Sequence, residues 1–150
     1  MRIFYLTLLM LLTSMIVSTP ASERAPSEYE RTVMCESFCR DRLAVWQTRL
    51  GLEMWHISVV MTRKSEFKPN TIGNIHWDPS DKTAVIRVLD PADYKIPLPY
   101  ALEDMENTVV HELVHLEISP VASGMERTEI NVKILETTVN RITAGLLGTP

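Results

Sequence analysis

Two histidines and a glutamate lie within five residues of one another, in the segment Val110-His111-Glu112-Leu113-Val114-His115-Leu116. If the segment is helical, the histidines are one turn apart on the same face, so both imidazoles can reach one Zn²⁺. Glu112 follows the first histidine directly and projects toward the open coordination position of such a metal. A carboxylate at that point can take a proton from metal-bound water and pass it to a leaving amine. The spacing therefore predicts metal-assisted hydrolysis.

The same stretch resembles the active-site helix of the zincin metallopeptidases, position by position from Thr108 to Leu116. It departs from that signature at Glu117, where an apolar residue is usual. The wider pattern is similar to very small bacterial and phage metallopeptidases, in which a Leu-x-x-Trp strand (here Leu52 to Trp55) precedes a hairpin, an edge strand, the zinc helix and a glutamate-bearing helix. The resemblance covers about residues 46–147. It implies a zinc-dependent endopeptidase acting on a peptide or protein, with His111 and His115 as zinc ligands and Glu112 as the general base.

The third zinc ligand is open between two residues of the last predicted helix. No histidine follows His115, which excludes the metzincin arrangement and leaves the gluzincin one, a glutamate from the next helix. Glu136 lies in a run similar to the ligand-bearing segment of the small families, and its distance from His115 is close to that in thermolysin-like enzymes. An antiparallel helix that starts near Ser123 would instead bring Glu129 level with His115. We expect Glu136 and keep Glu129 as the alternative.

Other residues have weaker candidate roles. The strand over Thr83 to Val88 has two interpretations. The resemblance suggests that Val85 to Val88 form the edge that pairs with an extended substrate, and the alternative is an ordinary core strand. An oxyanion donor would assist hydrolysis, and three residues could supply one: Tyr94, Tyr100 and His76.

The elements that must position these residues follow from periodicity and turn signals. Helical spacing predicts a first helix over 23–50, with Gly51 at its end. Strands are expected over 55–61, 72–77 and 83–88, the last two as a hairpin around the turn at 78–82, and a proline-rich loop over 90–100. Two helices follow, one over 102–118 that Pro120 stops, and one that a capping box at Ser123 and Glu126 opens and that reaches Leu147. This order predicts an α+β fold, with helices on one face of a small three-stranded sheet.

The N-terminus predicts export. Met1-Arg2 precedes a short apolar stretch from Ile3 to Val17, and the small residues Thr19 and Ala21 suit a signal peptidase, so we expect a signal peptide over 1–21 and a single domain over 22–150. The chain would then be secreted or periplasmic. An uncleaved membrane anchor is the alternative, and a membrane is expected as a partner only in that case.

Composition narrows the partners and the alternative functions. The chain of 150 residues has a net charge of −4 and no long basic run, which disfavours nucleic-acid binding. Its two cysteines, Cys35 and Cys39, are four apart and predict either buried free thiols or a strained bridge. The alternative to an enzyme is a non-catalytic interaction protein that zinc stabilises. A structural zinc site, however, normally has four protein ligands, and the sequence offers three.

Overall fold

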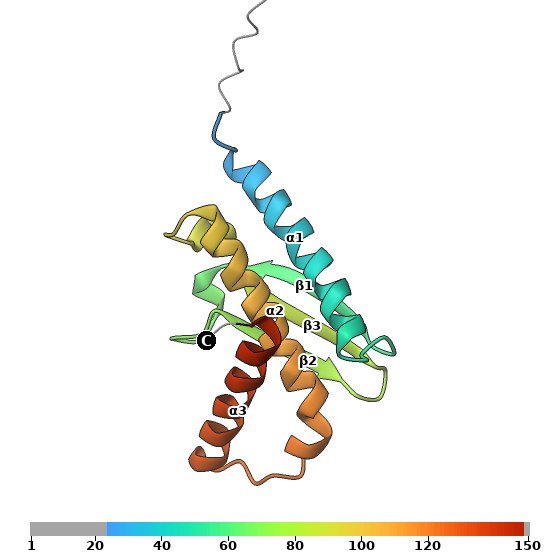
Figure 1. Cartoon of the computed structure of the whole chain (residues 1–150). Coiled ribbons are helices and arrows are strands. Elements are labelled where there is room, and N and C mark those ends of the chain that lie inside the picture. Colours follow the sequence, from blue (N-terminus) through green and yellow to red (C-terminus); the bar gives the residue numbers. More distant parts are fainter. Residues whose placement is uncertain (1–23, 149–150) are drawn as a thin grey trace, which may run out of the picture.

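The computed structural model describes residues 24–148 and has the predicted α+β architecture. Three helices accompany one small sheet (Figure 1): α1 (Glu28–Arg49), β1 (His56–Thr62), β2 (Gly73–Asp78), β3 (Thr83–Leu89), α2 (Leu98–Ala122) and α3 (Glu129–Leu147). Single 3₁₀ turns, η1 (Lys64–Glu66) and η2 (Pro91–Asp93), lie in the connections. The predicted signal peptide over 1–21 lies outside the described residues. None of the described helices is long and apolar enough to cross a membrane.

The sheet is mixed, with strand order β1-β3-β2. β2 and β3 form the predicted antiparallel hairpin, with Ile75 opposite Ile86. β1 pairs with β3 on the other side in parallel, with Val59 also opposite Ile86. Of the two interpretations of the strand over Thr83 to Val88, the core strand is confirmed and the edge strand is wrong, because both edges of β3 are paired. β3 carries the most buried residues of the three strands, which suits a central position.

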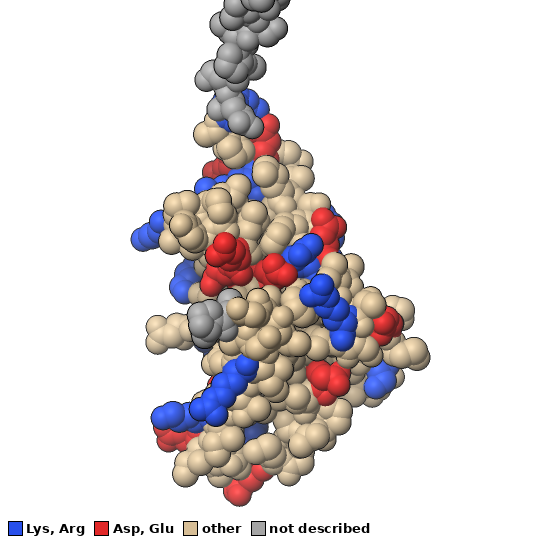
Figure 2. Space-filling model, viewed as in Figure 1, with Lys and Arg blue, Asp and Glu red and all other residues tan. Residues whose placement is uncertain are grey.

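One face of the sheet carries the core. Val59, Ala84, Ile86 and Val88 point toward the helices and join the inward residues of α1 and α2 in a single cluster. Figure 1 shows α1 and α2 lying across the sheet and α3 packed beside α2. The helices lie on one face, as predicted. On the face of the molecule shown in Figure 2, acidic and basic side chains are interspersed and form no continuous basic patch.

α1 follows its sequence signals closely. Ser27 caps it through a reciprocal capping box with Glu30, and Gly51 follows it with a positive φ of 69°. Its inward residues include Cys35 and Cys39, which are buried and free, so of the two predicted states the unbridged one is present.

The predicted ends of the last two helices need correction. α2 begins at Leu98, inside the predicted loop, because a proline such as Pro99 is tolerated in a first turn, where amides have no helical partner. It also runs past Pro120 to Ala122. A proline this close to the end of a helix removes only one backbone hydrogen bond, so it does not stop the helix there.

The predicted capping box at Ser123 is wrong. The Ser123 amide donates to the carbonyls of Ser119 and Val121, so the residue closes α2. α3 starts six residues later at Glu129, where the Thr128 hydroxyl accepts from the Asn131 amide. Glu126 consequently lies in the connection between the two helices and caps neither of them.

Candidate metal site

α2 presents His111 and His115 on one face, one turn apart, as its periodicity requires. Their Nε2 atoms are 3.1 Å apart, and the ring centroids are 4.8 Å apart at an interplanar angle of 69°. Burial, followed by the neighbouring His115, lowers the pKa of His111 below its usual value. A neutral imidazole has a lone pair, which is the form that a metal ion requires.

α3 supplies the third group, Glu136. Its Oε1 lies 3.3 Å from His115 Nε2, and its Oε2 lies 3.6 Å from His111 Nε2. Glu129 is exposed at the first residue of the same helix and is not a member of this cluster. The structure thus brings His111, His115 and Glu136 together and leaves Glu129 outside.

The three donors fit a metal ion. Ligands placed tetrahedrally at about 2.0–2.2 Å from a zinc-sized ion are about 3.3–3.6 Å from one another. The observed separations of 3.1, 3.3 and 3.6 Å are close to this interval. Within residues 24–148, these are the only histidine, cysteine and carboxylate groups gathered closely enough to hold a metal ion.

Glu112 lies beside this cluster, on the side that faces the sheet. Its side chain is buried, and the backbone N–H of Ile75 in β2 donates a hydrogen bond to its carboxylate. Burial and then the charge of Glu136 raise the pKa of Glu112 to about 8, while the Ile75 amide acts in the opposite direction. A nearby metal ion favours the ionised carboxylate, because an opposite charge lowers the pKa of an acid.

β2 approaches this carboxylate closely because it begins with a glycine. A Cβ added at Gly73 would collide with the Thr108 side chain and lie 3.4 Å from Glu112 Oε1. The edge strand beside the site is therefore β2, and not the strand β3 that the resemblance suggested.

Asn140 is a residue of the site that sequence reasoning missed. The His111 ring donates a hydrogen bond to the Asn140 side chain, which favours the protonated ring. Asn140 lies one turn beyond Glu136 on α3, so the same helix face carries both groups. The signal in the sequence was its spacing of four residues from Glu136, which places both side chains on one face of a helix. A hydrogen bond of this kind orients the ring of a metal-binding histidine.

The three candidate oxyanion donors lie elsewhere. Tyr94 donates a 2.6 Å hydrogen bond to Asp104 and packs near the cysteines of α1. Tyr100 is exposed in the first turn of α2, about 16 Å along the helix from His111. His76 alternates with the inward Ile75 and Trp77, so its side chain is on the opposite face of the sheet. The structure brings none of them to the cluster.

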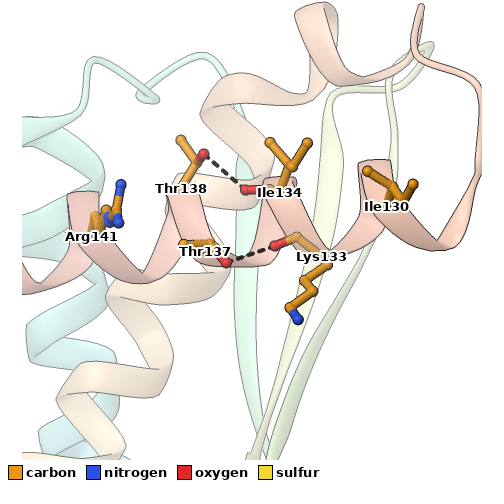
Figure 3. A pocket seen from close by; sticks show the side chains of 6 residues that line it. All are labelled: Ile130, Lys133, Ile134, Thr137, Thr138 and Arg141. Carbon is orange, nitrogen blue, oxygen red and sulfur yellow. Dashed lines mark hydrogen bonds between the residues drawn. The ribbon is translucent and has the colours of Figure 1, made fainter.

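Two hollows lie near α3. One, of about 540 Å³, reaches His115 and Glu136 and extends between the β2–β3 hairpin and the connection from α2 to α3. The other, of about 350 Å³, is an open depression on the outward face of α3 (Figure 3). It is formed by one helix alone, and its lining residues are Ile130, Lys133, Ile134, Thr137, Thr138 and Arg141.

Comparison of the chain with protein-family models, with curated proteins and with solved structures found no match. The assignment of function therefore rests on the residues and their geometry.

Proposed function

We propose that this chain is a zinc-dependent metallopeptidase that hydrolyses peptide bonds as an endopeptidase. The observation that carries the proposal is the three-donor cluster of His111, His115 and Glu136 with a buried carboxylate, Glu112, beside it. Three protein ligands leave one tetrahedral position open, which is the pattern of catalytic rather than structural zinc sites. Imidazole and carboxylate donors suit Zn²⁺, which supports zinc over harder ions.

The roles of the residues follow from this geometry. His111, His115 and Glu136 would hold the metal, and Asn140 would orient the His111 ring. When bound, Zn²⁺ supplies polarisation of the scissile carbonyl and lowers the pKa of its water to about 7. Glu112 accepts a proton at its carboxylate from the attacking water and then donates it to the leaving amine nitrogen.

Substrate binding would involve β2. As the edge strand beside the site, it offers unpaired backbone groups to an extended peptide, which adds to a sheet through main-chain hydrogen bonds. Since Ile75 is already bonded to Glu112, the outward groups of Gly73 and Trp77 are the ones available on either side of it.

The metal content of the purified mature chain tests the site. The wild type is expected to carry one equivalent of zinc, and Glu136→Ala is expected to lose it. Glu129→Ala is the matched control, because it removes an exposed glutamate from the same helix and should retain the metal. Zinc lost from Glu129→Ala and kept by Glu136→Ala would contradict the assignment.

The alternative, a non-catalytic interaction protein that zinc stabilises, is separated by activity. We expect the zinc-loaded chain to cleave an unfolded protein substrate. Stoichiometric zinc without cleavage would favour the alternative.

We further propose that residues 1–21 are an export signal, on the basis of the apolar run and small residues given above. A mature protein beginning at Ser22 is the expected result of N-terminal sequencing. A protein retained in the membrane fraction and beginning at Met1 would indicate an anchor.

A further inference from the structure

The larger hollow adjoins the candidate metal site directly. Its volume of about 540 Å³ is within the usual range for small-molecule pockets, and one end is formed by His115 and Glu136. A substrate residue next to the cleaved bond would therefore have its side chain within reach of this hollow.

The walls are mainly apolar and come from five parts of the chain. We call the hollow the tryptophan pocket, after Trp55 and Trp77. Its large apolar wall residues are Trp55, Trp77, Met125, Val132 and Leu135. Both tryptophans are partly buried and pack against the core, so their indole rings are supported from behind. Val132 and Leu135 share a face of α3 with Glu136, which aligns the pocket with the cluster.

The Trp55 wall is fixed by several contacts. Lys82 Nζ stands over the Trp55 ring, 4.8 Å from its centroid, and the Lys82 carbonyl accepts a 2.7 Å hydrogen bond from the His56 amide. Gln47 Nε2 donates to the Trp55 carbonyl at 2.7 Å. The Trp55 side of the pocket is thus held in place without a ligand, which reduces the entropy lost on binding.

The apolar character of the walls selects the class of side chain that the pocket accepts. Two cations, Lys82 and Arg127, line it, and Glu126 adds one carboxylate besides Glu136. A charged substrate side chain of either sign would lose water against the apolar walls, which costs free energy. An aromatic ring loses little hydration and can stack on the edges or faces of the indoles.

We propose that the tryptophan pocket binds a large apolar side chain, preferably aromatic, of the substrate residue next to the cleaved bond. This specificity rests on the proposed peptidase function, because it assigns a substrate class to the same site. Burying an aromatic ring in such a pocket favours binding by tenfold or more over a residue without a side chain.

The test compares two metal-chelating probes that differ only in the side chain, phenylalanine hydroxamate and glycine hydroxamate. Binding is followed by tryptophan fluorescence in the zinc-loaded full chain, which requires no turnover. Val132→Phe fills the pocket from a partly exposed position on α3. Ile134→Phe is the matched control, since it adds the same ring to the outward face of the same helix.

The wild type and Ile134→Phe are expected to bind the phenylalanine probe at least tenfold more tightly than the glycine probe. Val132→Phe is expected to lose that preference while binding the glycine probe as before. Equal affinities in the wild type, or a preference that survives in Val132→Phe, would overturn the proposal. Zinc content measured on the same samples separates the two proposals. Bound zinc without probe selectivity would contradict the proposed specificity alone. Absence of zinc would contradict the proposed peptidase function and, with it, the proposed specificity.

Discussion

Glu112 is the residue at which metal binding and hydrolysis can be separated, because it lies beside the cluster without belonging to it. We expect Glu112→Gln to lower kcat/KM by about 10²–10⁴-fold, the usual contribution of a general acid–base. A glutamine has nearly the same shape and can still accept from the Ile75 amide, so zinc content should not change. Cleavage assays and metal analysis on the same preparation check both statements.

The control for this variant is Glu117→Gln, an exposed glutamate on the same helix. It should retain full activity. Full activity in Glu112→Gln would contradict the proposed proton transfer, even with zinc bound.

The buried thiols make a separate prediction about reactivity. Burial, followed by the neighbouring Cys35 and Glu36, raises the pKa of Cys39 to about 12, and burial also raises the pKa of Cys35. Since the thiolate is the reactive form, the folded chain should react with iodoacetamide far more slowly at pH 8 than the urea-unfolded chain. The rate in the folded state should rise as pH rises toward 12. Equal rates for the folded and unfolded chain, followed by mass spectrometry, would contradict the burial of these residues.

At the scale of elements, the contact between β2 and α2 depends on Gly73. A methyl group there would collide with the Thr108 side chain and press toward Glu112, so either the strand or the helix must move. We expect Gly73→Ala to lower the free energy of unfolding by about 1–3 kcal/mol, as overpacking does. Activity should fall as well, because Glu112 loses its position.

Two variants test the physical reason for that loss. Gly145→Ala adds the same methyl group to α3, where nothing lies within 4 Å, and should be neutral or slightly stabilising. Thr108→Ser removes the Cγ2 atom with which the Gly73→Ala methyl collides, so combining the two changes should recover part of the stability. Urea unfolding of the wild type, the three single variants and the double variant gives the comparison, and no recovery in the double variant would contradict the steric explanation.

The elements also show which features a sequence can predict. The spacing of His111 and His115 is a local property of one helix, and so is the pairing of β2 with β3 through a short turn. Both were predicted correctly. The pairing of β1 with β3 joins residues about 27 positions apart, such as Val59 and Ile86, and depends on the whole sheet. No local pattern distinguished the central strand from the edge strand.

The third member of the cluster was ambiguous for a related reason. The argument for Glu129 assumed a helix that starts near Ser123, and its outcome depends on that starting point. Because Thr128 rather than Ser123 caps α3, the second turn of the helix carries Glu136. The same argument, that the second turn of this helix lies level with His115, therefore favours Glu136 when it is applied to the observed helix. Asn140 was missed because its partner His111 lies on another helix.

At the scale of the whole molecule, α3 is the element least secured by the core. It packs chiefly on α2, and its buried residues are Val139 and Thr143 alone. The Thr143 hydroxyl is one of the few buried side-chain groups without a hydrogen-bond partner in the described chain. A metal ion held by His111, His115 and Glu136 would join α3 to α2 and restrain the helix.

Removing the metal should therefore loosen α3 before the rest of the chain. A ligand present at 100 times its Kd stabilises the folded state by about 2.7 kcal/mol, which corresponds to roughly 10 °C in Tm for a domain of this size. We expect a chelator to lower Tm by about this amount. Amide hydrogen exchange should accelerate in α3 and change little in α1 and the sheet. Glu129→Ala should respond as the wild type does, whereas Glu136→Ala should start at the lower Tm and not respond. A chelator effect of equal size in Glu136→Ala would contradict the assignment, since Glu136 would then contribute no ligand to the metal that stabilises the fold.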